Sequence, residues 1–221
     1  IIKITKSILN KSMKKILRKI YINNFKHIFH MVQNSQSKYF EFDEIKLKIK
    51  KKNTLGNIDE IITTRFDQVI TPNILNNGSW DLFIINFVNT RTKYTNKKFD
   101  IIDIGSNIGF ITRQLLNTNK SILRSYCIEP NLNNFKIMKQ NLIKFKNKVF
   151  LYNFALTNDF KKKKKLFLDN KNFGNYSLLK KKGGADIVKT LNANIFLNKI
   201  IKKNKIKNLI YKSDTQGFDE I

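Results

Sequence analysis

Residues 99–116, FDIIDIGSNIGFITRQLL, change from one hydrophobic period to another within a single short stretch. The first six are a nearly continuous apolar run, which is typical of a strand buried on both faces. Two glycines and the polar residues between them predict a turn, and the residues that follow have the apolar spacing of a helix. A glycine-containing turn from strand to helix lies at the carboxyl end of a parallel sheet, where α/β proteins bind ligands.

The alternation of strand and helix patterns continues along the chain and predicts an α/β fold. Such alternation implies a parallel, Rossmann-like sheet that is covered by helices on both faces. The predicted elements after the first helix are strands at 121–130, 148–156 and 207–216, helices at 131–146 and 192–204, and short extended pieces and loops over 160–190.

The region before this domain has a different character. Residues 1–38 are basic with helical apolar spacing, 39–52 alternate as in a half-exposed strand, and 58–90 predict helical pieces around a turn at Asn76-Asn77-Gly78. We therefore expect a basic, mostly helical extension over 1–60 and the α/β domain over 61–221. The chain opens on Ile1 and stops directly after a polar motif, so we expect the domain to be incomplete at its C-terminus.

The first turn favours one class of cofactor. It lacks the Gly-Lys-Ser/Thr of a P-loop, and Asn107 replaces the second glycine of the dinucleotide pattern G-x-G-x-x-G. Asp103, at the strand end, repels phosphate but suits a cationic amino group. S-adenosylmethionine has an amino-acid end and no phosphate, so the pattern of Asp103, Gly105 and Gly109 favours it. The alternative is an ordinary turn that needs glycine for its geometry.

The next two strands end in residues that fit an adenosine. Glu129 ends the second strand, 20 residues beyond Gly109, where a carboxylate can accept hydrogen bonds from both ribose hydroxyls. NAD enzymes use the same arrangement, so Glu129 indicates a ribose without naming the cofactor, and its alternative is a solvated loop acid. By position alone, Asn153 and Ala155 on the third strand suggest adenine packing; core packing explains Ala155 equally well.

The fourth strand ends in three alternating polar residues, Lys212, Asp214 and Gln216, which share one side of an extended segment. Methyl transfer would explain them, because the enzyme must hold a nucleophile in line and remove its proton. Asp214 is then expected to orient or deprotonate a hydroxyl and Lys212 to stabilise the resulting oxygen. The alternative is a strand end that frays into solvent.

Other residues limit the chemistry. The single cysteine, Cys127, excludes an internal disulfide, fits a reducing, cytoplasmic compartment and is expected in the core. His27 and His30 have no carboxylate or cysteine near them in the sequence, so no metal site is predicted. No apolar run is long enough to span a bilayer, although the amphipathic N-terminus would allow peripheral contact with a membrane surface.

The net charge of +27 raises the question of an anionic partner such as nucleic acid. Lysines are spread through the whole chain rather than clustered, and Lys, Asn and Ile dominate throughout. A nucleic-acid-binding face should be clustered. We attribute the charge mainly to overall composition and keep an RNA substrate as an alternative.

Taken together, these segments resemble the FkbM family of S-adenosylmethionine-dependent methyltransferases over about residues 70–221. The resemblance is carried by GSW (78–80), DIGSNIGFITRQL, IEPN, NFAL, NFGNYSL (172–178) and YKSDTQGFDE. The last is the most specific, since Lys212, Asp214, Gln216, Gly217 and Phe218 match the family pattern, while Asp219 and Ser213 depart from it.

The resemblance implies a class I methyltransferase fold and O-methylation of a hydroxyl on a sugar, glycan or small metabolite. The alternatives are an RNA methyltransferase and a binding module that keeps the fold without turnover. Neither the acceptor nor the oligomeric state follows from the sequence. The expected catalytic residues are Asp214, Lys212 and Gln216, and the expected cofactor-binding residues are Asp103, Gly105, Ser106, Asn107, Gly109, Phe110, Glu129, Pro130, Asn153 and Ala155.

Overall fold

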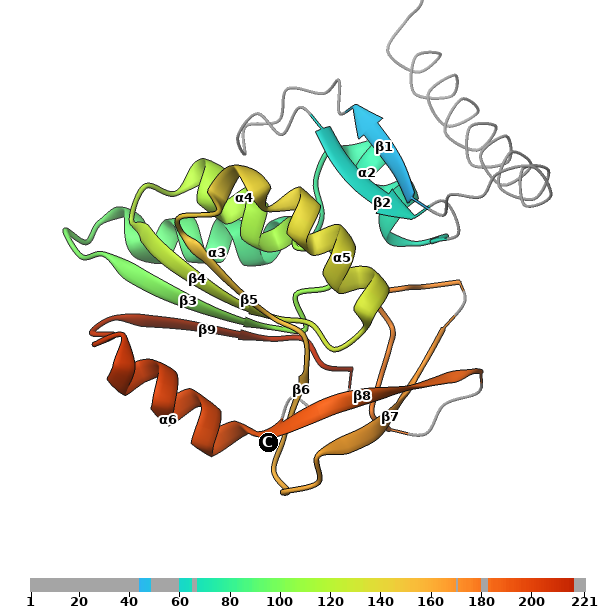
Figure 1. Cartoon of the computed structure of the whole chain (residues 1–221). Helices are drawn as coiled ribbons and strands as arrows, with labels where there is room; N and C mark the ends of the chain where they lie inside the picture. Colours follow the sequence, from blue (N-terminus) through green and yellow to red (C-terminus); the bar gives the residue numbers. More distant parts are fainter. Residues whose placement is uncertain (1–43, 49–59, 65–66, 170, 180–182, 217–221) are drawn as a thin grey trace, which may run out of the picture. The chain divides into compact units, whose positions relative to one another are not determined.

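The computed structural model describes most of the chain from Glu44 onward (Figure 1). The described residues are 44–48, 60–64, 67–169, 171–179 and 183–216. The helical pattern predicted over 1–38, with His27 and His30, lies outside them, as do Gly217, Phe218 and Asp219 of the closing motif.

A four-stranded parallel sheet forms the centre of the domain. Its strands are β3 (Phe99–Ile104), β4 (Ile122–Ile128), β5 (Val149–Tyr152) and β9 (Leu209–Ser213), in the order β5-β4-β3-β9. Along the chain this is the third, second, first and fourth strand, which is the order of Rossmann-like folds. The predicted fold class is therefore confirmed. The register places Asp103 level with both Cys127 and Lys212.

Helices cover both faces of this sheet (Figure 1). The helices α3 (Leu82–Lys93), α4 (Phe110–Thr118) and α5 (Leu132–Asn141) lie on one face, and α6 (Ala193–Lys203) lies on the other. Successive strand residues point to opposite faces, so each face has its own apolar core. One cluster joins Ile85, Ile101, Ile111, Leu115 and Ile122, and the other joins Ile102, Tyr126, Ile128, Phe196 and Ile200.

A second, smaller sheet departs from the predicted pattern. The apolar run at 148–156 was expected to be one strand, but β5 ends at Tyr152 and β6 (Ala155–Thr157) enters a different sheet. That sheet has the order β6-β8-β7, with β7 (Lys163–Phe167) antiparallel to β8 (Ala185–Asn192). Asn153 and Phe154 lie between the two strands, at the point where the chain leaves the central sheet.

The prediction of helical pieces over 58–90 is wrong for its first residues. β2 (Glu60–Thr64) is a strand that pairs antiparallel with β1 (Glu44–Lys48), and it spans the domain boundary expected at residue 60. The predicted turn does follow α2 (Ile70–Asn77), where Gly78 is left-handed with φ 67°. Among the described residues, no helix is long and apolar enough to cross a membrane.

Hydrogen bonds of the Asn141 side chain link β2 to the carboxyl end of β3 in the central sheet. The Asn141 side chain accepts a hydrogen bond from the Ile62 amide and donates to the Ile62 carbonyl, both at 2.8 Å. It also donates to the carbonyl of Ile108 in the turn after β3, at 2.9 Å. A buried amide side chain with its hydrogen bonds satisfied stabilises the position of both segments.

Candidate functional site

The turn after β3 is shaped by the close approach of β9. The Asp214 amide donates to the Ile104 carbonyl at 3.0 Å, so the chain after β9 runs directly past Gly105. A Cβ on Gly105 would lie 2.0 Å from the Asp214 carbonyl oxygen, and Gly105 has φ 71°. Only glycine satisfies both conditions. This glycine therefore allows two strand ends to meet, in addition to any contact with a ligand.

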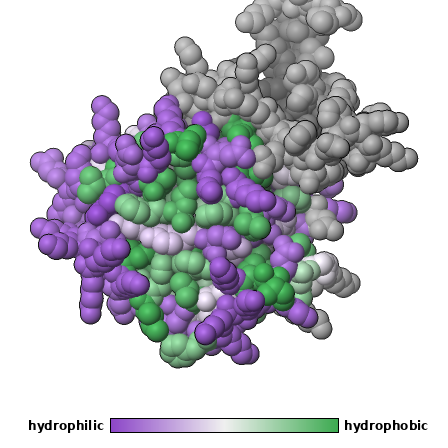
Figure 2. Space-filling view, viewed as in Figure 1, coloured by the Kyte–Doolittle hydropathy of each residue, from purple (hydrophilic) through white to green (hydrophobic). Residues whose placement is uncertain are grey.

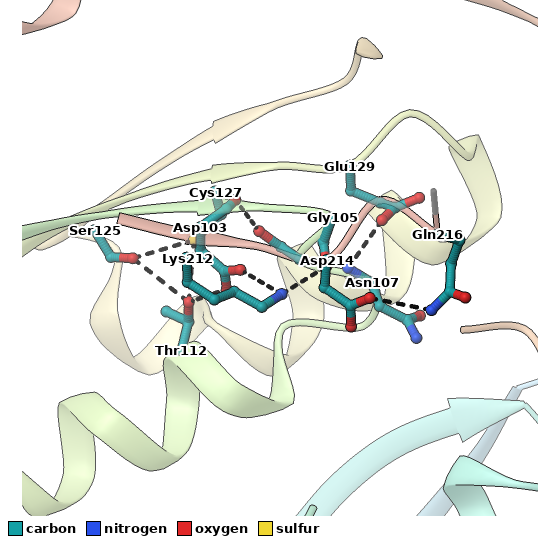
Figure 3. Close-up of polar contacts among 11 residues, drawn as sticks. Asp103, Gly105, Asn107, Thr112, Ser125, Cys127, Glu129, Lys212, Asp214 and Gln216 are labelled. Carbon is teal, nitrogen blue, oxygen red and sulfur yellow. Dashed lines mark hydrogen bonds and ion pairs between the residues drawn. The ribbon is translucent and has the colours of Figure 1, made fainter. Parts of the chain in front are cut away.

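Asp103 is part of a buried polar cluster below this turn (Figure 3). Its side chain is almost completely buried, and one carboxylate oxygen lies 2.9 Å from the Lys212 ammonium. The other oxygen accepts a hydrogen bond from the Thr112 hydroxyl at 2.7 Å. Lys212 also donates to the Gly105 carbonyl at 3.0 Å. Asp103 of β3 and Lys212 of β9 therefore neutralise each other's charge at the strand ends.

The ion pair determines the charge state of Lys212. Burial by itself lowers the pKa of Lys212, but the carboxylates around it, Asp103 foremost and then Asp214 and Glu129, together more than offset this effect, so the net pKa is raised. Lys212 is therefore a fixed cation at neutral pH. A cation in this place can stabilise negative charge on a neighbouring oxygen, but it cannot remove a proton.

Glu129, at the end of β4, is held in a different way. Its two carboxylate oxygens accept hydrogen bonds from the backbone amides of Asn107, at 2.8 Å, and Asn131, at 2.9 Å. Burial raises the pKa of Glu129 to about 7, although both amides favour the charged form. Each carboxylate oxygen has a second lone pair, so Glu129 retains the capacity to accept further hydrogen bonds.

Two narrow cavities adjoin at the carboxyl ends of the strands. The first has Glu129 in its wall and the second has Lys212, and they share Gly105, Asn107, Gly174 and Asp214. Their volumes are about 70 and 80 Å³. The Asp214 side chain, which accepts a hydrogen bond from the Gln216 amide at 3.0 Å, therefore lies at the junction between them.

The segment that includes Phe173 and Gly174 covers both cavities. The Phe173 amide donates to the buried carboxylate of Asp67 at 3.3 Å, and its carbonyl accepts a hydrogen bond from the Asn134 side chain at 3.1 Å. A Cβ on Gly174 would lie 3.2 Å from the Asn107 side-chain nitrogen. Gly174 and Asn107 each line both cavities, so they lie where the two cavities adjoin.

The structure brings most of the predicted site residues to these cavities. All three predicted catalytic residues, Lys212, Asp214 and Gln216, line the second cavity. Among the predicted cofactor residues, the first cavity is lined by Gly105, Asn107, Glu129, Pro130 and Ala155, and the second by Gly105, Ser106, Asn107 and Phe110.

Three predicted cofactor residues, Asp103, Gly109 and Asn153, line neither cavity. Asp103 is engaged by Lys212 and Thr112 as described above. Gly109 precedes α4 with φ 76°, and a Cβ there would meet Met138 and Leu142. The Asn153 side chain donates to the carbonyls of Glu129 and Pro130, at 2.9 and 3.0 Å. Asp103, Gly109 and Asn153 therefore stabilise the backbone at the strand ends and do not line the cavities.

Several cavity residues were not predicted from the sequence. Trp80 lines the second cavity, and Asn134, Phe173 and Tyr176 line the first. They lie on a loop, on α5 and on the covering segment, so the strand-end pattern could not identify them. The signals that the sequence did contain are the motifs GSW, which includes Trp80, and NFGNYSL, which includes Phe173 and Tyr176.

Cys127 takes no part in the site. It is completely buried, and burial raises the pKa of its thiol to about 12, so it is a neutral core residue. Within the described part of the chain, no three His, Cys, Asp or Glu residues form a group that could hold a metal ion.

Comparison with known proteins gives only partial matches. No family model matches the sequence, and no curated protein does. Among solved structures, a protein from Staphylococcus aureus described as a caffeoyl-CoA O-methyltransferase matches with 24% identity and a TM-score of 0.30, over 38% of this chain and 41% of the other. TrmK of M. capricolum, solved with S-adenosyl-homocysteine, matches with 25% identity and a TM-score of 0.26, over 31% and 30%.

A third match is a precorrin 8w decarboxylase from Methanobacterium thermoautotrophicum, with 19% identity and a TM-score of 0.27, over 34% of this chain and 40% of the other. The aligned segments thus span less than half of each of these solved chains. The class of fold follows from the strand order and helix layers of the chain itself: it is a Rossmann-like α/β domain with a polar site at the carboxyl ends of its parallel strands.

Proposed function

We propose that this chain is an S-adenosylmethionine-dependent methyltransferase of the FkbM type, which transfers a methyl group to a hydroxyl of a sugar, glycan or small metabolite. The observation that carries the proposal is the pair of adjoining cavities. The first contains Glu129, whose carboxylate suits a ribose, the second contains the Lys212 cation, and Asp214 lines both. A cofactor and an acceptor that bind in neighbouring cavities would meet at Asp214.

The residues of the first cavity fit the polar groups of an adenosine. Glu129 has lone pairs available for the two ribose hydroxyls. The side-chain oxygens of Asn107 and Asn134 are buried and have no hydrogen-bond partner among the described residues. Buried acceptors without partners are costly, and the hydroxyls and amino group of the cofactor would supply the missing donors.

The covering segment would have to move for the cofactor to enter. The two cavities are small, and Gly174 and Asn107 line both of them. If the segment moves away from Asn107, the cavities become one continuous site. Closure of the same segment over the bound cofactor would then exclude water from the reaction.

The residues of the second cavity fit the chemistry of methyl transfer to a hydroxyl. The cofactor supplies an activated methyl group on a sulfonium centre. Asp214 would accept the proton of the acceptor hydroxyl, and Lys212 would stabilise the negative charge that develops on that oxygen. Gln216, whose side-chain amide donates to Asp214, would orient this carboxylate.

Calorimetry with S-adenosylmethionine tests the cofactor assignment. We expect Glu129→Ala to weaken binding at least tenfold, because it removes the acceptor for the ribose hydroxyls. We also expect binding by the unmodified chain to weaken as the pH falls below about 7, where Glu129 becomes protonated. Asp159→Ala is the matched control, since Asp159 pairs with Lys164 outside both cavities. Binding that is absent in the unmodified chain, or equal in both variants, would refute the assignment.

Transfer of a labelled methyl group to glycan, lipid, small-metabolite and RNA fractions tests the reaction. We expect label in a hydroxyl-bearing glycan or metabolite fraction, and its loss in Asp214→Asn while cofactor affinity is retained. Label that enters only RNA would replace the proposed acceptor class. Cofactor binding without label in any fraction would favour a binding module.

A further inference from the structure

An apolar groove lies on the α6 side of the domain, outside the site described above. Its volume is about 690 Å³, which is within the roughly 300–1,000 Å³ of small-molecule pockets. It is lined by aromatic and aliphatic residues of β5, β8, α6 and the loops beside them, together with the four lysines Lys161, Lys162, Lys199 and Lys203.

Large apolar side chains in this groove are exposed to solvent. Phe160 is 78% exposed and Ile195 is 59% exposed, and Phe150 and Leu191 are also exposed. In Figure 2, hydrophobic residues gather on the visible face over the sheet edge and α6, among hydrophilic residues. Contiguous apolar surface of this kind marks a site of interaction.

The lysines give the groove a positive charge. Lys161 and Lys162 line it beside Phe160, and Lys199 and Lys203 line it from successive turns of α6. None of the described residues that line the groove is acidic, and the nearby Asp159 is already paired with Lys164 at 2.7 Å. The charge therefore favours an anionic occupant. It disfavours a second copy of this chain, whose net charge is +27.

The groove has the shape of a site for a linear chain. Its lining residues on α6 run from Ile195 to Lys203, which is about 12 Å along the helix. The rings of its floor pack edge to face with one another, Tyr152 against Phe196 at 5.1 Å and Phe154 against Phe196 at 4.8 Å. These edge-to-face pairs stabilise the positions of the rings along the groove.

We propose that this groove binds a long-chain carboxylate, with the alkyl chain along the aromatic and aliphatic residues of β5 and α6 and the carboxylate at the lysines. The apolar side chains supply the hydrophobic contacts, which strengthen with each methylene group that is buried. The lysine ammonium groups supply charge-assisted hydrogen bonds to the head group. The site lies apart from the proposed cofactor cavities, with which it shares none of its lining residues.

Binding of hexadecanoate to the full chain, measured by calorimetry below its micelle-forming concentration, tests this proposal. We expect saturable binding, and a loss of at least tenfold in affinity in Ile195→Asp, because a carboxylate then lies in the groove. The variant should fold, since an acidic residue in the first turn of α6 favours the helix. Ile143→Asp is the matched control, because Ile143 is similarly exposed, at 67%, and lines no part of the groove.

The head-group assignment has its own test. Lys162→Glu combined with Lys199→Glu should weaken hexadecanoate binding at least tenfold, whereas the matched pair Lys136→Glu with Lys144→Glu, on exposed residues outside the groove, should not. Hexadecanol should bind at least tenfold more weakly than hexadecanoate.

Three outcomes would overturn the proposal. The first is no saturable binding of hexadecanoate, and the second is equal binding by Ile195→Asp and its control. The third is binding of a single-stranded RNA oligonucleotide or an acidic peptide, lost in Ile195→Asp, in place of hexadecanoate. Since every groove variant should retain its affinity for S-adenosylmethionine, failure here is distinguishable from failure of the proposed methyltransferase function.

Discussion

Asp103 and Glu129 are two carboxylates at the ends of neighbouring strands, both almost completely buried, with opposite electrostatic environments. Asp103 has a cation 2.9 Å away, whereas the contacts that hold Glu129 are backbone amides. The pKa of Glu129 is raised to about 7, because burial there outweighs the favourable contacts.

The comparison separates a structural carboxylate from one that can respond to a ligand. The charge of Asp103 is neutralised within the protein, and Asp103 lines neither cavity, so the pair with Lys212 stabilises the junction of β3 and β9. Glu129 lines the first cavity and titrates near neutrality. The variants below change one carboxylate at a time and test this division.

The largest effect is expected from Asp103→Leu. The variant leaves the Lys212 cation buried without its partner, and loss of one member of a buried ion pair costs about 3–5 kcal/mol. Urea denaturation should show this loss in the free energy of unfolding. The double variant with Lys212→Met should recover most of it, because no unpaired charge remains. If the double variant is as unstable as the single one, the cost does not come from the unpaired charge.

Asp159→Ala is a control for the effect of burial. Asp159 also pairs with a lysine, Lys164, at 2.7 Å, but both side chains are partly exposed. Because solvent screens such a pair, its removal is expected to change the free energy of unfolding very little. A loss as large as that of Asp103→Leu would show that burial is not what distinguishes the two pairs.

For Glu129, we expect a pH-dependent contribution of about 3 kcal/mol to the free energy of unfolding. Burial raises the pKa of Glu129 from its ordinary value of 4.5 to about 7 in the folded chain. Between these values the folded state retains a proton that the unfolded state has released, so stability falls as the pH rises from about 4.5 to 7 and then levels off. Glu129→Gln should remove this contribution. Unfolding free energies of the two chains, measured across this range, should therefore differ by an amount that changes with pH.

The contributions of the other titrating groups are the same in both chains, so they cancel in the difference between the two unfolding free energies. The glutamine loses one hydrogen bond with a backbone amide, but this cost does not depend on pH. Parallel curves for the two chains would contradict the raised pKa, and with it the contrast between Glu129 and Asp103.

Periodicity in the sequence is sufficient to predict several parallel strands that end in polar residues. Buried runs and glycine turns identify β3, β4 and β9, and parallel strands place their carboxyl ends at the same edge. Lys212, Asp214 and Gln216 therefore meet at one cavity, as the pattern indicated. The pairing of Lys212 with Asp103 could not be predicted, since the register of β3 against β9 is a tertiary property that depends on more than 100 intervening residues.

The residues that the sequence did not reveal are those outside the strand ends. Asn134 and Phe173 reach the first cavity from a helix and a loop, and a hydrogen bond between them fixes their positions. The apolar run at 148–156 gave no sign that β5 and β6 enter different sheets, because alternation specifies a strand and not its partner. β2 was missed because a short apolar segment is ambiguous between strand and helix.

The smallest effect expected around the two buried carboxylates is at the Thr112 hydroxyl, which contacts Asp103. Thr112→Val keeps the shape of the side chain but removes the hydrogen bond to the second oxygen of Asp103. Loss of a buried hydrogen bond to a charged group costs about 1.5–3 kcal/mol, and the value should lie at the lower end because Lys212 still compensates the charge. Urea denaturation should show this loss while calorimetry shows unchanged affinity for S-adenosylmethionine, as Thr112 lines neither cavity. A weakened affinity at unchanged stability would instead place Asp103 among the groups that respond to the cofactor, together with Glu129.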